Sequence, residues 1–264
     1  MACAWSTAGS GAAATEESWQ LMFNPQHMTS ASSRALIFQQ ALAAACKARK
    51  QNLPAVPASM PVLFAEADKG PSQLLSRPDA RQALNEIRAR LFQAPGRDIE
   101  AQSAWHESVA TAVFAARVAQ LRGACVCVSF CGGLLHRAGE ALALNTLARV
   151  ELDHRLQLDS ASRRDWCANN GPELAERLVR AWEVPAEVAA CVVGWKRFGE
   201  FAQVSAESAA LYFGRLFAVE VLHPQFCVPG AIDHAAAELG LAPDCVAQVR
   251  AEEPRVQDLI HALD

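Results

Sequence analysis

The chain has 264 residues, a formal net charge of -4 and an apolar fraction of 52%. It is long enough to bury a substantial core, and it lacks the surplus of basic residues with which nucleic-acid-binding proteins neutralise phosphates. Alanine is abundant, whereas aromatic residues make up only 7% and tyrosine occurs once, so the composition favours helices over strands and predicts an all-α fold.

The sequence also bears on compartment. No apolar run approaches the roughly 18 residues of a membrane-spanning helix, and residues 1–18 lack the charged start and apolar centre of a secretory signal. The nine cysteines are odd in number, and Cys46, Cys191 and Cys245 stand among apolar neighbours, so reduced buried thiols are expected. We therefore expect a cytoplasmic protein without a membrane partner, a nucleic-acid partner or a cofactor.

The first part of the chain changes character near Ser33. Residues 1–30 are small and polar without a sustained amphipathic period, which predicts a flexible extension. A helical period then begins and should continue to about Lys50. The basic cluster Lys47-Ala48-Arg49-Lys50 falls at the end of this helix, where the helix dipole favours cations, so it does not indicate a nucleic-acid site.

Proline and glycine divide the next segment. Three prolines between Leu53 and Pro61 exclude a continuous helix there. Beyond them, Leu84, Ile87 and Leu91 are spaced to form the buried face of one helix, which the Pro-Gly pair at 95–96 should end.

The strongest helical pattern covers Ala101–Leu121. Its apolar stripe at helical spacing consists of Trp105, Val109, Ala112, Val113 and Ala116. The following run, Ala124–Leu135, is almost wholly apolar and predicts a helix buried on most sides.

Three cysteines, Cys125, Cys127 and Cys131, lie in that apolar run and raise the hypothesis of a zinc site. Positions two apart on a helix point to different sides, and no Cys-x-x-Cys or nearby Cys/His pair completes four ligands. Small buried side chains are therefore the favoured interpretation.

The centre of the chain is Gly132–Glu140, which reads Gly-Gly-Leu-Leu-His-Arg-Ala-Gly-Glu. Its glycines and leucines predict a close-packed helix that brings the polar pair His136-Arg137 to the middle of a bundle. Apolar residues recur from Leu142 to Val150 and continue the helical pattern. Two further helices are predicted to carry Leu174, Leu178, Trp182, Val188, Val192 and Trp195. The pattern also predicts helices over residues 206–222, 232–239, 243–250 and 254–263.

These motifs resemble two related families. Gly132–Glu140 resembles the Gly-Leu-Leu-His-Asp-Ile-Gly-Lys run of the HD superfamily, whose His-Asp pair binds a metal that activates water for phosphoester hydrolysis. The Leu-Pro-x-x-Pro opening at Leu53 and the Leu-x-x-x-Trp-x-x-Pro signature over Leu178–Pro185 resemble the HDOD family, a signalling branch related to that superfamily. The resemblance covers about Leu53–Leu222. It implies a smaller N-terminal helical lobe at 31–100 and an HD-like (HDOD) helical bundle at 101–264, which follow the flexible extension that the composition predicts at 1–30.

The resemblance also places the metal ligands of HD proteins on this chain. They correspond to Glu107, His136, Arg137 and a position near Arg215, and the terminal histidine pair of HD relatives corresponds to Trp195-Lys196. A guanidinium has no lone pair to give a metal and carries a permanent positive charge. The sequence therefore predicts no metal site and no catalysis.

A candidate degenerate pocket remains, formed by Glu107, His136, Arg137, Lys196 and Arg215. One hypothesis is that its basic residues bind a small anionic ligand through charge-assisted hydrogen bonds. The favoured interpretation is that Arg137 pairs internally with Glu107 or Glu140 and that His136 is a hydrogen-bonded core residue.

The functional expectation follows from the resemblance. It implies a non-catalytic bacterial signal-transduction module that regulates other signalling proteins through protein-protein interaction. Two alternatives stay open: a metal-dependent HD-type phosphohydrolase that acts on nucleotides or cyclic dinucleotides, and an anion or nucleotide sensor that uses the basic former metal pocket.

Overall fold

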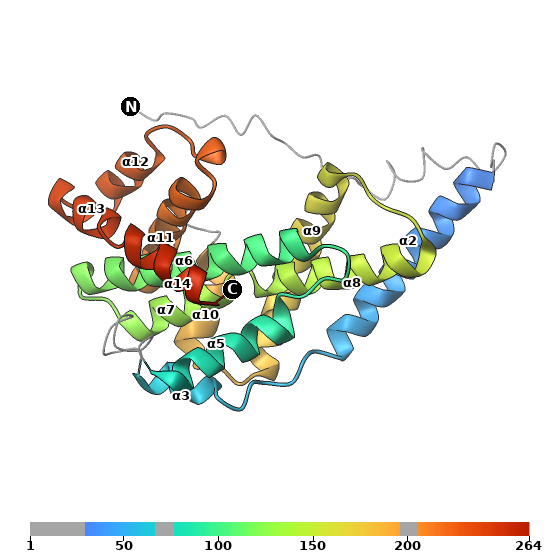
Figure 1. Ribbon diagram of the computed structural model, residues 1–264, viewed down its shortest axis with the longest axis horizontal. Coiled ribbons are helices and arrows are strands. Elements are labelled where there is room, and N and C mark those ends of the chain that lie inside the picture. The colour runs from blue at the N-terminus through green and yellow to red at the C-terminus, as the bar shows by residue number, and fades with distance from the viewer. Residues whose placement is uncertain (1–29, 67–76, 196–204, 264) are drawn as a thin grey trace.

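The computed structural model describes residues 30–66, 77–195 and 205–263 (Figure 1). No strand occurs in these ranges, which confirms the all-α prediction. The predicted extension at 1–30 lies outside them except for Ser30, and so does Lys196. The elements are α2 (Ser30–Gln51), α3 (Met60–Glu66), α5 (Pro78–Leu91), α6 (Asp98–Arg122), α7 (Val126–Leu135), α8 (Ala138–His154), α9 (Ser160–Ala181), α10 (Ala186–Gly194), α11 (Ala206–Leu222), the short 3-10 helix η4 (Pro224–Phe226), α12 (Ala231–Glu238), α13 (Pro243–Arg250) and α14 (Glu253–Leu263).

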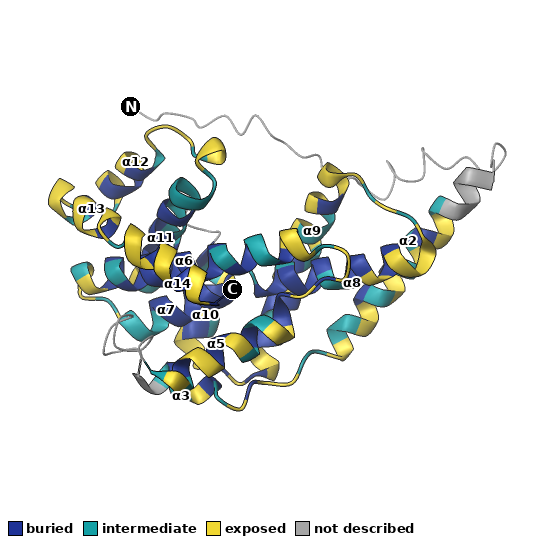
Figure 2. Ribbon diagram, in the orientation of Figure 1, coloured by how far each residue is buried: buried dark blue, intermediate teal, exposed yellow. Residues whose placement is uncertain are grey.

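Helix α6 is the central element of the fold. Helices α7 and α11 pack along it, and α8, α13 and α14 also contact it. The sequence predicted an apolar stripe, but every residue from Glu107 to Ala116 is buried, so burial extends around the whole helix (Figure 2). The cause is the number of small side chains, because alanine lets neighbouring helices approach from several sides. This burial also encloses three polar residues of α6, namely Glu107, Ser108 and Thr111.

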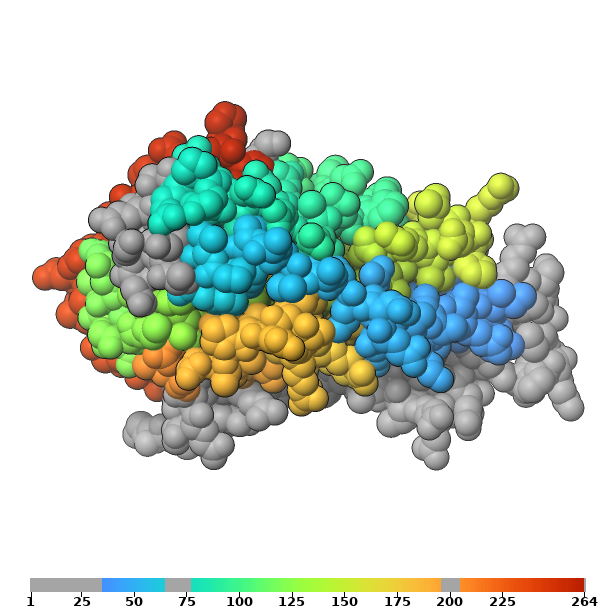
Figure 3. Space-filling model, turned by 90° about the horizontal axis from the view of Figure 1, so that it is seen from below, coloured from blue at the N-terminus to red at the C-terminus, as the bar shows by residue number. Residues whose placement is uncertain are grey.

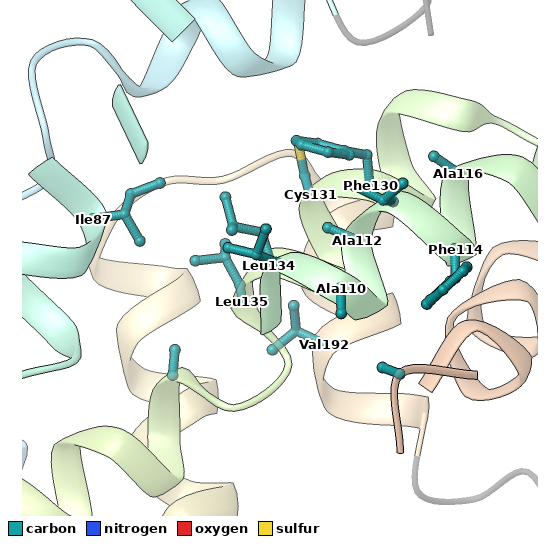
Figure 4. Close-up of a cluster of buried hydrophobic side chains, with 14 of the residues drawn as sticks. Ile87, Ala110, Ala112, Phe114, Ala116, Phe130, Cys131, Leu134, Leu135 and Val192 are labelled. Carbon is teal, nitrogen blue, oxygen red and sulfur yellow. The ribbon is translucent and has the colours of Figure 1, made fainter. Parts of the chain in front are cut away.

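One continuous core joins the helices before and after residue 100. Leu84, Ile87 and Leu91 are buried, as their spacing predicted. In Figure 4, Ile87 from α5 lies near Leu134 and Leu135 from α7, and Val192 from α10 lies on the opposite side of the α7 leucines. The division of the chain into a lobe at 31–100 and a bundle at 101–264 therefore remains a prediction, since α5 contributes to the same core as α6–α10.

The first described helix, α2, packs mainly on α8 and also contacts α9. Its contact with the bundle is a small separate cluster made by Phe38, Leu42, Leu147 and Val150. Polar contacts extend this packing, since Arg49 Nη2 donates to Asn145 Oδ1 at 2.7 Å. The helix is thus held to the bundle near its C-terminal half.

The proline segment after α2 runs as an extended strap across the surface. In Figure 3 it appears as the light-blue band between the teal surface of α5 and the gold surface of α9 and α10. Trp182 Nε1 donates a hydrogen bond to Pro54 O at 2.8 Å, and Arg90 Nη1 donates to Ala55 O at 3.1 Å. Proline carbonyls remain free to accept although proline has no N–H to donate, so the strap is fixed by side chains of the bundle.

The described helices include none that combines the length and the apolar character needed to cross a membrane. The eight cysteines in the described ranges are all free thiols. Burial raises the pKa of the Cys191 thiol to about 12 and that of Cys167 to about 12 as well, so both are protonated and unreactive at neutral pH.

Candidate functional site

The candidate site lies where α7 ends and α8 begins. The sequence predicted one helix through Gly132–Glu140, and this was wrong: α7 ends at Leu135, and Arg137 has φ -100° and ψ 3°, outside the helical region. At this break Arg137 lies against α6, where its guanidinium pairs with Glu107. Close packing was predicted correctly, because an ideal Cβ on Gly133 would lie 2.6 Å from Ala112 Cα of α6. Gly133 thus allows α7 to touch the α6 backbone beside Glu107.

Glu107 is the centre of the site. Its side chain is only 4% exposed, and each carboxylate oxygen faces a different arginine. Arg137 Nη1 donates to Oε2 at 2.5 Å, while Arg215 Nε from α11 lies 3.0 Å from Oε1 in an ion pair that lacks hydrogen-bond geometry. Residues from three helices or their ends therefore meet on one buried acid.

The charges of the site nearly cancel. Arg137 also pairs with Glu140, whose Oε2 accepts from Arg137 Nε at 3.1 Å. The internal pairing favoured from the sequence is therefore present with both acids. Two carboxylates face two guanidinium groups here, so the site has little net charge with which to attract a further anion.

The two arginines keep Glu107 ionised. Burial by itself raises the pKa of this carboxyl, but the charges of Arg137 and Arg215 outweigh that effect and hold the pKa well below its ordinary value. His136 Nε2 is 3.9 Å from Glu107 Oε1, which is too far for a hydrogen bond, so the guanidinium groups are the main cause. Glu107 is therefore ionised in the folded protein at neutral pH.

His136 is a buried, neutral side chain. Its Nδ1 lies 2.6 Å from the carbonyl oxygen of Gly133, which can only accept, so Nδ1 carries a hydrogen and donates it. Burial lowers the pKa of the imidazole, and the neutral ring therefore has its lone pair on Nε2. No described protein group donates to Nε2, and the side chain is 0% exposed.

Trp195 completes the site from the end of α10. Its ring packs edge to face with His136 at a centroid distance of 5.2 Å, and the guanidinium of Arg215 lies 5.2 Å from its centroid. These contacts hold the Arg215 cation beside Glu107. By family resemblance, Trp195 was predicted to stand at the position of a metal-binding histidine of HD relatives, but it was not included in the predicted pocket. The motif gives its position, whereas its two ring contacts depend on the end of α7, which carries His136, and on α11, which carries Arg215.

The side chains present do not fit a divalent cation. Both oxygens of Glu107 face guanidinium groups, and the remaining donor is the lone pair of His136 Nε2. Across the described ranges, no group of three or more His, Cys, Asp or Glu side chains is placed to hold a metal. The cysteines of α7, Cys127 and Cys131, are therefore not part of such a group. A guanidinium would repel a metal ion at the position that Arg137 occupies.

The structure brings four of the five predicted pocket residues together: Glu107, His136, Arg137 and Arg215. The fifth, Lys196, lies outside the described residues. Binding of a ligand by these residues stays a prediction. Glu140 and Trp195 join them as contact partners.

Comparison with known families places this site within a recognised domain. The sequence model of the HDOD domain matches residues 84–195, which include Glu107, His136, Arg137 and Trp195 but not Arg215. Neither the curated proteins nor the solved structures gave a match. The matched range runs from within α5 to the end of α10 and includes the break between α7 and α8. Residues 84–195 therefore match the HDOD family that the motifs of the sequence resemble.

Proposed function

We propose that this protein is a non-catalytic regulatory module of bacterial signal transduction, which acts by binding other signalling proteins. The observation that carries the proposal is the ion-pair network that Glu107 makes with Arg137 and Arg215. By family resemblance, Arg137 stands at one metal-binding position of HD relatives and Arg215 at or near another. The HDOD domain over residues 84–195 supports the signalling role by family resemblance.

The chemistry of the site supports the absence of hydrolysis. Metal-dependent hydrolysis needs several lone-pair donors around the cation and an open position for water. Here one such donor, His136 Nε2, is not already directed to another group, and its ring is enclosed by Trp195. Glu107 is held by two permanent cations, so its carboxylate stabilises the packing of α6 against the α7–α8 break and α11.

The charge balance gives the sensor hypothesis no support. An anion would meet guanidinium groups whose charges Glu107 and Glu140, two acids of the chain itself, already balance. The attraction available to a phosphate is therefore largely used within the protein.

Turnover and ligand binding by the full-length protein separate these functions. We expect no hydrolysis of nucleotides, cyclic dinucleotides or a chromogenic phosphodiester with added Mn²⁺, Fe²⁺ or Mg²⁺, and no thermal stabilisation by the same nucleotides. Hydrolysis that requires His136 would establish the enzyme. Salt-sensitive stabilisation lost in Arg215→Gln, without turnover, would establish the sensor.

The interaction itself is tested by partner capture from extract of the source organism, followed by titration of the purified candidate against the full-length protein. Saturable binding of a signalling protein is the expected result. Failure of every captured protein to bind in purified form would contradict the proposal.

A further inference from the structure

Outside the Glu107 site, two arginines stand on the seam where α2 lies against α8. Figure 3 shows this seam, with the blue surface of α2 directly beside the yellow-green surface of α8. Arg49 of α2 reaches across it: Nη2 donates to Asn145 Oδ1 at 2.7 Å, and Nε donates to Thr146 Oγ1 at 3.2 Å. Arg149 is exposed and stands one helical turn after Asn145, so the two residues share a face of α8.

The partners of Arg49 fix its guanidinium in place but leave its charge unbalanced. Asn145 and Thr146 are neutral, and each is itself held by a hydrogen bond to a backbone carbonyl. Burial lowers the pKa of Arg49, and the positive charge of Arg149 lowers it further, as expected where one cation faces another without an acid between them. The seam therefore holds a prepositioned pair of cations.

The acids of α8 do not supply the missing charge. Glu151 pairs with Arg97, and two residues of helix separate it from Arg149, so it points to another side. Asp153, one turn after Arg149, is exposed and forms no ion pair with it. Across the described ranges, no acid lies within 4.0 Å of the guanidinium nitrogens of Arg49 or Arg149. A negative charge that balances this pair has to come from outside the described chain.

An exposed apolar side chain adjoins the two cations. Leu152 is 66% exposed and lies three residues after Arg149, which places both on the same side of α8. A free anion would contact the cations alone, whereas a protein segment can also cover the leucine. Arginine is enriched at protein interfaces, where complementary charges select the partner. The surface therefore fits a polypeptide that presents an acidic group next to an apolar side chain.

We propose that Arg49, Arg149 and Leu152 form a docking surface for an acidic segment of a partner protein. A carboxylate of the segment accepts hydrogen bonds from the two guanidinium groups, and an apolar side chain of the segment packs on Leu152. The inference rests on the proposed function, because it gives the chemistry of the protein partner. It uses residues separate from the Glu107 site.

Titration with defined peptides tests this docking surface. The probe is a short peptide of glutamate and leucine with blocked ends, and its control has glutamine in place of glutamate. In NMR spectra of the full-length protein, the Arg49 Nε–H signal should shift with the acidic peptide and not with the control, and less at high salt, which screens exposed charges. An Arg49 signal that stays in place, or that moves equally with the glutamine peptide or with inorganic phosphate, would overturn the proposal.

Variants test the residues of the surface. Arg149→Gln should weaken binding of the acidic peptide by about fivefold, the upper end for an exposed ion pair, and Leu152→Ser should weaken it too. Arg164→Gln is the matched control and should leave binding unchanged, because Arg164 is also exposed, lies on α9 and forms no ion pair with the described residues. Equal losses in the two arginine variants would contradict the surface, since they would show attraction to the overall charge alone.

The captured partner separates this inference from the proposed function. Its binding should also weaken in Arg149→Gln and not in Arg164→Gln. If the partner binds wild type and Arg149→Gln equally well, the docking surface is refuted and the proposed function stands. If no captured protein binds in purified form, the proposed function itself fails.

Discussion

Substitution of Glu107 by glutamine removes the negative charge that two arginines share. Loss of one partner from a buried ion pair costs about 3–5 kcal/mol, because the other charge is left uncompensated. The side chains of Arg137 and Arg215 are 26% and 32% exposed, so water screens part of that cost. Glu140 also remains as a partner for Arg137. We therefore expect Glu107→Gln to lower the free energy of unfolding by about 2–3 kcal/mol, or the melting temperature by about 5–10 °C in a protein of this size.

Urea denaturation at pH 7, followed by circular dichroism, measures this loss. Glu173→Gln is the matched control, because Glu173 also contacts two basic groups, Lys50 and Arg177, but its side chain is 45% exposed. Exposed ion pairs contribute little, so the control should lose much less stability than Glu107→Gln. Equal losses in the two variants, or a Glu107→Gln protein as stable as the wild type, would refute the reasoning that the buried network stabilises the fold.

Three further predictions follow from the geometry. Gly133→Ala should lower the free energy of unfolding by at least about 1–3 kcal/mol, because the new Cβ would lie 2.6 Å from Ala112 Cα. Gly194→Ala, whose new Cβ meets its nearest atom at 3.8 Å, should be tolerated. Equal urea midpoints for the two variants would contradict the close contact at Gly133. Below pH 6.5, the ordinary pKa of histidine, His136 is protonated in the unfolded chain, whereas the buried ring of the folded protein stays neutral, so the free energy of unfolding should fall as the pH decreases towards 5. His136→Phe should flatten this pH dependence. The same slope in both proteins would be inconsistent with a neutral buried ring. The contribution of Glu107 stays constant over that interval, because its folded-state pKa is lowered and its stabilisation declines only below the ordinary value of 4.5. Trp182→Phe should lower the free energy of unfolding by about 0.5–1.5 kcal/mol, the usual contribution of a hydrogen bond, and should speed proteolysis of the strap. An unchanged rate of cleavage between Leu53 and Pro57 would show that Trp182 does not fix the strap.

Local patterns predicted most of the helices because local interactions set their ends. The helix at 206–222 is an example: the Ser205 side chain accepts a hydrogen bond from Ser208 N, and the apolar period continues to Leu222. The break at His136-Arg137 could not be predicted in this way. No proline marks it, and the contact that fixes Arg137 is to Glu107, which lies 30 residues earlier on another helix.

The site was predictable only in part, because some of its contacts join residues that lie far apart in the sequence. A family motif placed Glu107, His136 and Arg137, and charge complementarity suggested that the arginine pairs with an acid. The contact between the Arg215 guanidinium and the Trp195 ring depends on how α10 and α11 pack together. The orientation of the His136 ring depends on its hydrogen bond to the Gly133 carbonyl near the end of α7. Neither relation appears as a pattern along the chain.

The central claim is that a permanent cation, Arg137, occupies the place of a metal ligand and leaves Glu107 bound to arginine. Elemental analysis of the full-length protein, purified without chelators from cells supplied with Fe, Mn and Zn, tests this claim most directly. We predict only substoichiometric metal, with the same content in wild type and His136→Ala. One equivalent of metal in the wild-type protein, lost in His136→Ala, would contradict the account.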